Sequence, residues 1–134
     1  MSVRTKQQAA SKRRRAIWLA GGVALAALVV VVAAGLRAAA VRSAQSQRLV
    51  GRWLRPDGGY VLEIRAARRD GQLEAAYFNP RPIHVAQANH RRDGGEVAVF
   101  VELRDVNYPG STYTLRYVPA QDRLMGEYFQ ALQR

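Results

Sequence analysis

The sequence predicts a small all-β domain, an antiparallel meander that forms a barrel or a curved sheet, preceded by one transmembrane helix. Two observations support this fold class. Residues 16–36 contain no charged side chain. From residue 50 onward, short runs of β-branched and aromatic residues alternate with turn signals every roughly 8 to 12 residues. We therefore divide the chain into a basic cytoplasmic tail (1–15), a transmembrane helix or signal sequence (16–36), a linker (37–48) and the β domain (49–134).

The apolar segment is long enough to cross a membrane, because 21 residues form a helix of about 31 Å, the hydrocarbon thickness of a bilayer. Basic residues at 12–15 directly precede it. The positive-inside rule then predicts a cytoplasmic N-terminus, with the domain in the periplasm and Trp18 at the inner interface of a bacterial inner membrane. The alternative is a cleaved signal peptide, since Ala38-Ala39-Ala40 resembles a cleavage site and would release the domain into the periplasm. Residues 37–48 either extend the helix or form a tether.

Charge and cysteine content exclude several classes of function. The net charge is +11, but residues 1–48 carry nine basic residues and no acid, whereas the domain carries twelve Arg and ten acids. The domain itself is thus only +2, and we expect no nucleic-acid partner. Because Cys is absent, there is no disulfide, thiol nucleophile, thiolate metal site or lipid-bearing cysteine.

Seven short strands are expected, and their positions are 50–54, 60–66, 72–79, 83–88, 96–104, 112–118 and 123–130. Alternation assigns one face of each strand to the core, and the longest apolar stripe consists of Val97, Val99, Val101 and Leu103. Pro80 and Pro82 predict a corner or a bulged edge at 79–82. Pro109-Gly110 predicts a type II turn within a loop at 105–111.

Three segments resemble a known family: GRWLRPDGGY at 51–60, YFNPRPI at 77–83 and VELRDVNYPGSTY at 101–113. Over residues 49–131 the chain is similar to a family of small, uncharacterised, exported bacterial β proteins. The resemblance implies export but no activity. Members of that family continue into one further strand, which implies either an open sheet edge here or a chain that is truncated relative to the family. Gly51-Arg52-Trp53 is also similar to the first-strand element of lipocalin-like barrels, which implies that Trp53 closes one end of a barrel.

Residues that carry metal or acid–base chemistry are few. His84 and His90 would lie on one face of a strand but about 20 Å apart, so no metal or other cofactor is expected. Asp105 and Asn107 lack the spaced acids of a calcium loop and are expected to cap their own turn. Ser111 lacks the sequence context of a nucleophile.

Carboxylate pairs on adjacent strands could act as acid and base, and the candidates are Glu63 with Glu74 and Glu102 with Glu127. Ion pairs of exposed carboxylates with Arg65, Arg104 or Arg116 are the more common arrangement.

Aromatic residues are the remaining signal, with ten among the 86 residues of the domain. Tyrosines inside a barrel indicate either a packed core or a cavity for a ligand with polar and apolar parts. Tyr108 is expected to be the most exposed of them, and the loops at 79–82 and 105–111 are expected to form a functional rim. The residues predicted to bind a ligand or partner are Tyr77, Asn79, Arg81, Asp105, Asn107, Tyr108 and Tyr113.

The leading hypothesis is a membrane-tethered periplasmic module that binds a small ligand or a protein partner and has no catalytic activity. A second hypothesis is a hydrolase or isomerase that uses Asp105, Glu102 or His84 near the 105–111 loop. A third is a structural subunit that pairs with another protein through an open sheet edge.

Overall fold

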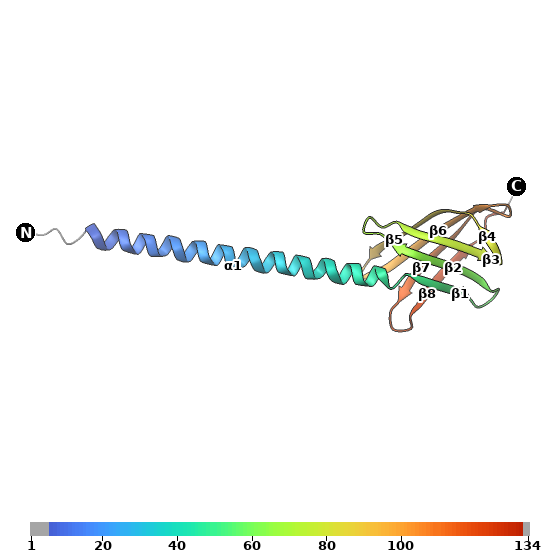
Figure 1. Ribbon diagram of the computed structural model, residues 1–134, viewed down its shortest axis with the longest axis horizontal. Coiled ribbons are helices and arrows are strands. Elements are labelled where there is room, and N and C mark those ends of the chain that lie inside the picture. Colours follow the sequence, from blue (N-terminus) through green and yellow to red (C-terminus); the bar gives the residue numbers. More distant parts are fainter. Residues whose placement is uncertain (1–5, 133–134) are drawn as a thin grey trace, which may run out of the picture. The chain divides into compact units, whose positions relative to one another are not determined.

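The computed structural model describes the backbone of residues 6–132 and the side chains of residues 21–132. The chain forms two compact units, Met1–Val41 and Arg42–Arg134. Residues 6–41 of the first unit are helical, and the second unit contains every strand of the described residues (Figure 1).

The helix α1 extends over Lys6–Gln47. Within the described residues, the stretch Gly21–Gln47 is long and apolar enough to cross a membrane. The mean hydropathy of its most apolar part is 2.3, and no residue of that part is buried inside the protein. The expected apolar N-terminal helix is therefore confirmed. The predicted linker 37–48 is helical as far as Gln47, which is the first of its two expected forms. The side chains of Trp18 and of the basic residues at 12–15 lie outside the described residues.

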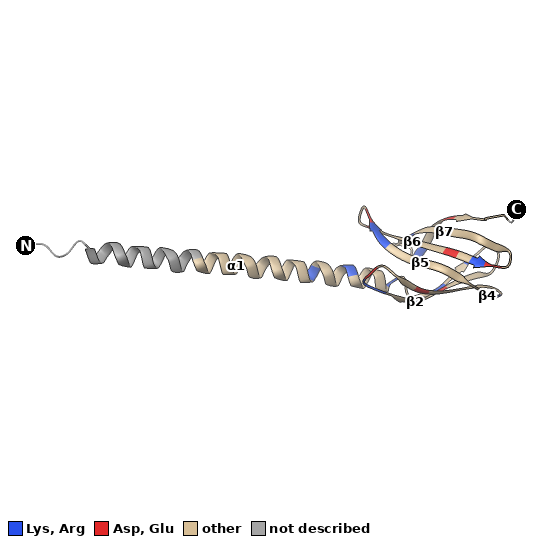
Figure 2. Ribbon diagram, turned by 90° about the horizontal axis from the view of Figure 1, so that it is seen from above, with Lys and Arg blue, Asp and Glu red and all other residues tan. Residues whose placement is uncertain are grey.

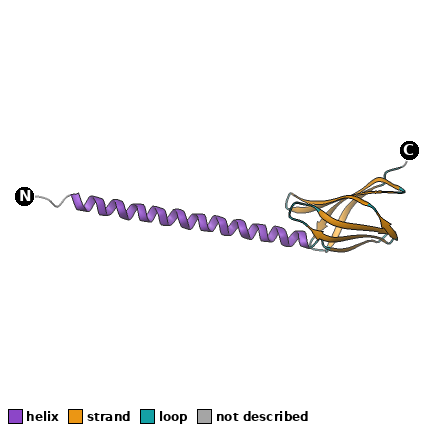
Figure 3. Ribbon diagram, turned by 45° about the horizontal axis from the view of Figure 1, so that its top comes forward, coloured by secondary structure: helices purple, strands orange, loops and turns teal. Residues whose placement is uncertain are grey.

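The β domain contains eight antiparallel strands in two four-stranded sheets, each in chain order (Figure 3). The first sheet consists of β1 (Gly51–Arg55), β2 (Tyr60–Ala67), β3 (Leu73–Asn79) and β4 (Arg81–Ile83). The second consists of β5 (Val85–Asp93), β6 (Glu96–Asp105), β7 (Tyr108–Val118) and β8 (Arg123–Phe129).

The predicted antiparallel meander is confirmed, but the strands form two sheets and neither closes on itself. The two sheets are joined near β3 and β5, where the His90 N–H donates to the Gly71 carbonyl at 2.7 Å and Gln72 bridges Asn89. At the opposite side, β1 and β8 each end their sheet.

The core lies between the two sheets and follows the alternation that the sequence predicts. Its buried side chains include Leu62, Ile64, Leu73 and Tyr77 from the first sheet and Val97, Val99, Val101, Leu103, Tyr113 and Tyr117 from the second. Leu49, directly after α1, is fully buried, and its carbonyl accepts a hydrogen bond of 2.9 Å from the Trp53 indole N–H. Trp53 is therefore anchored at the start of the domain.

The predicted loop at 105–111 and its Pro-Gly turn are wrong. Asp105 pairs with Tyr108, and only two residues connect β6 to β7. Asn107 takes the left-handed conformation that such a tight turn requires, with a φ of 68°. Pro109 lies within β7 opposite Arg104. It is tolerated because pairing with β8 begins only at Thr112, which leaves the other side of β7 open at this point.

The predicted strand 83–88 is also wrong in its bounds. The structure has two strands here, β4 ending at Ile83 and a longer β5 beginning at Val85, with His84 between them. Pro82 lies in the short edge strand β4, where a missing N–H donor is tolerated. The strand β5 continues to Asp93, since the turn to β6 consists of Gly94 and Gly95, both with positive φ. The domain thus has eight strands rather than seven.

Candidate ligand site

The turn between β1 and β2 places an arginine and an aspartate beside the space between the two sheets. Residues 56–59 connect Arg55 to Tyr60, and these two residues are opposite each other in the strand register. Gly59 has a φ of 67° and its N–H donates to the Arg55 carbonyl at 3.2 Å. A Cβ atom on Gly58 would overlap the ring of Tyr60. The absence of a side chain at Gly58 therefore allows this ring to lie against the turn.

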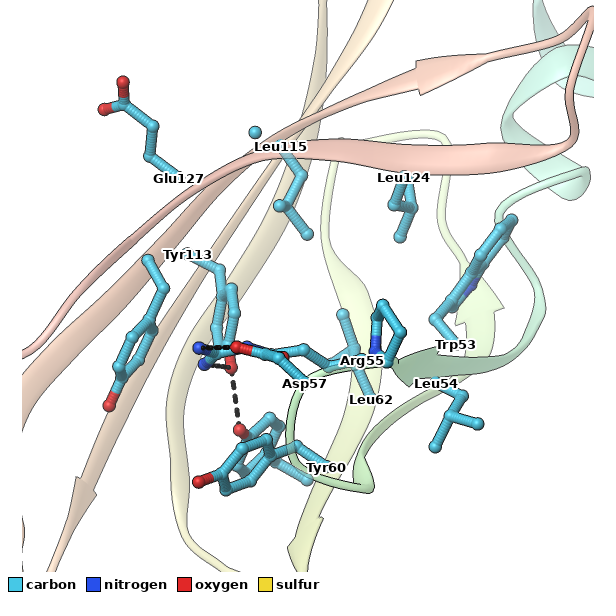
Figure 4. A pocket seen from close by; sticks show the side chains of 14 residues that line it. Trp53, Leu54, Arg55, Asp57, Tyr60, Leu62, Tyr113, Leu115, Leu124 and Glu127 are labelled. Atoms are coloured by element: carbon cyan, nitrogen blue, oxygen red, sulfur yellow. Dashed lines mark hydrogen bonds and ion pairs between the residues drawn. The ribbon is translucent and has the colours of Figure 1, made fainter.

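The Arg55 guanidinium is held on several sides (Figure 4). Its Nε and Nη2 donate to the two carboxylate oxygens of Asp57 at 2.7 and 2.6 Å. Its Nη1 donates to the Tyr113 hydroxyl at 3.1 Å, which joins the first sheet to the second. The rings of Tyr60 and Tyr128 lie 4.9 and 5.0 Å from its central carbon, within the range of a cation–π interaction.

These contacts affect both ionisable groups of the turn. The hydrogen bonds from Arg55 lower the pKa of Asp57 below its usual 3.8. The hydrogen bonds to Asp57 and Tyr113 raise the pKa of the Arg55 guanidinium further above its ordinary range. Both groups are therefore charged at neutral pH, and the pair is bidentate, which is the strong form of an arginine–carboxylate interaction.

A cluster of tyrosines lies next to Arg55. The hydroxyls of Tyr77 and Tyr113 are 2.7 Å apart, and the ring of Tyr128 lies 4.6 Å from that of Tyr113. Tyr60 stacks near Tyr77 at 6.5 Å, and Tyr108 meets Tyr77 edge-on at 6.3 Å. Burial, followed by the hydrogen bond with Tyr113, raises the pKa of Tyr77. The Tyr77 hydroxyl therefore stays neutral over the physiological pH range.

Two hollows adjoin this cluster, and both are bordered by Arg55, Tyr60, Tyr77 and Tyr128. The first, which we call the apolar hollow, has a volume of about 340 Å³ and is also lined by Trp53, Leu62, Leu115 and Leu124. The second, the rim hollow, has a volume of about 440 Å³ and is also lined by Asn79, Arg81, Asn107 and Tyr108. Volumes of this size suit small organic ligands.

Six of the seven residues predicted to bind a ligand or partner line one of the hollows. Tyr77, Asn79, Arg81, Asn107 and Tyr108 border the rim hollow, and Tyr77 and Tyr113 border the apolar hollow. The prediction that Tyr108 is the most exposed aromatic residue is wrong. Tyr108 is half-buried because the Asn79 amide donates to its hydroxyl at 2.5 Å, whereas Phe129 is 66% exposed.

Asp105, the seventh of these residues, lines neither hollow. Its Oδ2 accepts a hydrogen bond of 2.8 Å from the His84 N–H, and its Oδ1 accepts one of 2.7 Å from the Val106 N–H. These backbone donors lower the pKa of Asp105. The carboxylate therefore stabilises the β6–β7 turn and ties it to the start of β5.

The serine and the metal-ligating residue types considered above show no catalytic or metal-binding arrangement in the described residues. Ser111 is fully buried and its Oγ accepts a hydrogen bond from the Ala131 N–H at 3.1 Å. In the described part of the chain no group of His, Asp and Glu could hold a metal ion.

Two of the four carboxylates suspected as acid–base partners form ion pairs with arginines, Glu63 with Arg65 and Glu102 with Arg104. Arg116 pairs with Glu96, which was not among the candidates. Residues of both signs are interspersed on the strands (Figure 2).

Sequence reasoning missed Arg55, Asp57, Tyr60 and Tyr128 as site residues. The first three lie in the segment GRWLRPDGGY, where an Arg-x-Asp pair precedes two glycines and a tyrosine. That local pattern predicts an ion pair across a turn. The pattern does not indicate which distant strand lies over the ion pair. Apart from its aromatic character, nothing in the sequence marked Tyr128 as a neighbour of Arg55.

Comparison of the chain with models of protein families, with curated proteins and with solved structures finds no match.

Proposed function

We propose that this chain is a membrane-tethered binding module that holds a small ligand between its two sheets. The observation that carries the proposal is the pair of hollows that meet at Arg55 and the tyrosine cluster. Apolar walls supply binding energy, and a few fixed polar groups orient the ligand, which is the usual composition of a small-molecule site. No catalytic step is part of this proposal.

In this proposal α1 remains attached as an anchor in a bacterial inner membrane, with the N-terminus in the cytoplasm and the domain in the periplasm. The apolar helix and the basic residues before it support this topology. The two sheets act as the walls of an incompletely closed, lipocalin-like barrel. The resemblance to small exported bacterial β proteins agrees with this location.

Native mass spectrometry of the full chain, released from mild detergent, tests the proposal. The expected spectrum contains a second species that is heavier than the protein by the mass of one small molecule. Leu124→Trp fills the apolar hollow and should remove that species, whereas Met125→Trp adds the same ring at the exposed neighbouring position and should retain it. A wild-type protein without bound mass in every mild extraction would contradict the proposal.

A second candidate function, pairing with another protein through a sheet edge, is favoured by one observation. Exposed apolar side chains lie on one edge strand of each sheet, with Leu54 67% exposed on β1 and Met125 and Phe129 51% and 66% exposed on β8. Such edges accept an added strand. Chemical cross-linking in membranes should then trap a partner, and Leu54→Lys should abolish the cross-link.

A further inference from the structure

We propose that Arg55 is the anchor for the carboxylate of an organic ligand, and that Asp57 is an internal carboxylate that occupies this anchor until a ligand displaces it. This inference deepens the proposed function, because it assigns the chemical class of the ligand to the same site. It rests on four features of the turn.

The first feature is that the anchor already holds a carboxylate. Asp57 accepts hydrogen bonds from Nε and Nη2 of Arg55 at 2.7 and 2.6 Å, in the bidentate arrangement by which arginine recognises carboxylates. A ligand carboxylate in the same position would make the same two bonds.

The second feature is that Arg55 does not depend on Asp57 for its position. The Tyr113 hydroxyl and the rings of Tyr60 and Tyr128 contact the guanidinium from β7, β2 and β8. These groups remain when Asp57 moves away. The anchor is therefore preorganised, and a ligand does not have to order a flexible side chain when it binds.

The third feature is that Asp57 is free to leave. Its side chain is 57% exposed and lies in a turn that continues with Gly58 and Gly59. Among the described residues, Arg55 supplies both of the side-chain hydrogen bonds that Asp57 accepts. Turns that contain glycine rearrange at low cost because glycine has many accessible backbone conformations.

The fourth feature is the position of the anchor at the boundary of the two hollows. Arg55 borders both the apolar hollow and the rim hollow, and Asp57 borders the apolar hollow. Trp53, Leu115 and Leu124 line the apolar hollow that Arg55 borders, and we assign the organic part of the ligand to this hollow. The ligand class is therefore a small carboxylate with an apolar, flat body that fits beside aromatic rings.

Internal competition has a measurable consequence. The apparent affinity of a ligand is its intrinsic affinity multiplied by the fraction of molecules whose site is open, so removal of the competitor strengthens binding. Asp57→Asn retains the size of the side chain and removes its charge. We expect it to bind benzoate at least about tenfold more tightly than the wild type, since hydrogen bonds to charged groups are the stronger class.

Isothermal titration of benzoate into the full chain in nanodiscs, with empty nanodiscs as the reference, makes this measurement. Arg55→Lys combined with Asp57→Asn should lose the gain, because lysine cannot form the bidentate contact. Benzyl alcohol, which has the same ring without the carboxylate, should bind Asp57→Asn and the wild type equally. Asp57→Ser is a second variant that repeats the test if Asp57→Asn unfolds.

The matched control is Asp93→Asn, which alters the same Arg-x-Asp-Gly-Gly pattern at an exposed turn and should leave benzoate affinity unchanged. The inference is overturned if Asp57→Asn and Asp57→Ser show no gain, or if Asp93→Asn shows an equal gain. Its failure is distinct from failure of the proposed function, since a neutral molecule retained in native mass spectra would support a binding module without a carboxylate anchor.

Discussion

Two turns of the β domain share the local pattern Arg-x-Asp-Gly-Gly, at residues 55–59 and 91–95, but have different surroundings. In the first, the guanidinium and carboxylate are 2.6 Å apart and the arginine side chain is 33% exposed. In the second, the distance is 3.6 Å and the arginine is 76% exposed. A similar local pattern therefore produces a guanidinium enclosed by tyrosines in one place and a solvated ion pair in the other.

The difference arises from the turn length and from what lies across the domain. The 93–96 connection is a tight turn through Gly94 and Gly95, so the strands β5 and β6 pair up to their ends. The first connection has four residues, 56–59, between paired strands. Its arginine meets Tyr113 and Tyr128 from the second sheet. An ion pair that touches the opposite sheet can contribute to a site, whereas one that faces solvent contributes little.

The variant with the largest expected effect is Gly126→Ala, which should disrupt the enclosed turn from the opposite sheet. A Cβ atom at Gly126 would overlap the Thr114 carbonyl on the backbone of β7, so β8 must shift and carry Tyr128 away from Arg55. We expect a loss of about 3 kcal/mol in unfolding free energy. Urea unfolding of the full chain in detergent, followed by near-UV circular dichroism, measures it.

The control for this variant is Gly95→Ala in the exposed turn. No atom lies within 4 Å of a Cβ there, and only the φ of 90° opposes the change, for about 1–2 kcal/mol. If Gly126→Ala is no less stable than Gly95→Ala, the close approach of β8 to β7 is not what positions Tyr128.

The next largest loss of unfolding free energy is expected for Arg55→Ala, and Arg91→Ala is its control. Arg55→Ala loses two cation–π contacts and the hydrogen bond to Tyr113, and should destabilise the domain by about 2 kcal/mol. Arg91→Ala should change stability by less than about 0.5 kcal/mol, since its ion pair is exposed. Equal losses in the same urea experiment would mean that the two turns are energetically equivalent.

A smaller effect is expected for Tyr113→Phe, which removes the hydroxyl between Arg55 and Tyr77. One hydrogen bond to a charged group and one within the buried tyrosine pair are lost, for a cost of about 1–2 kcal/mol. Tyr117→Phe is the matched control, because its hydroxyl bonds to the exposed Asp122 and its loss should cost less. A Tyr113→Phe protein with wild-type stability would show that the hydroxyl does not link the sheets.

The smallest effect concerns pH. The pKa of Asp57 is lowered by Arg55, so the unfolded chain binds a proton at this position before the folded chain does as the pH falls. The stability that Asp57 contributes is therefore complete above its ordinary pKa of 3.8 and is lost as the pH falls through the lower folded value. The Tm difference between wild type and Asp57→Asn should be present at pH 7 and vanish in strong acid. A difference that persists in acid would exclude the ion pair as its source.

Much of the fold was predictable because strand and turn signals are local. Alternation correctly assigned the inward faces of β2, β3, β6 and β7, for example Leu62 and Ile64 on β2. The errors occurred where pairing overrides composition. Pro109-Gly110 has the composition of a turn, but the positive φ of Asn107 had already reversed the chain.

For the site, several residues that the sequence predicts to bind a ligand or partner, including Tyr77, Asn79 and Tyr108, line the rim hollow. The prediction used the general tendency of aromatic and polar residues near turns to form binding surfaces. It could not separate Asp57 from Asp93, since both follow arginine by two residues and precede two glycines.

By itself, the sequence determined an apolar N-terminal segment, an antiparallel chain of short strands and the face of most strands that is buried. These properties depend on periodicity and turn residues within about ten positions. Only the tertiary structure decided which Arg-x-Asp turn is enclosed. Arg55 and Tyr113 are 58 residues apart in the chain, and they meet because the first sheet packs against the second. The packing of one sheet on the other depends on the whole face of each sheet and not on any short sequence pattern. The residues that contact Arg55 are therefore decided by this packing.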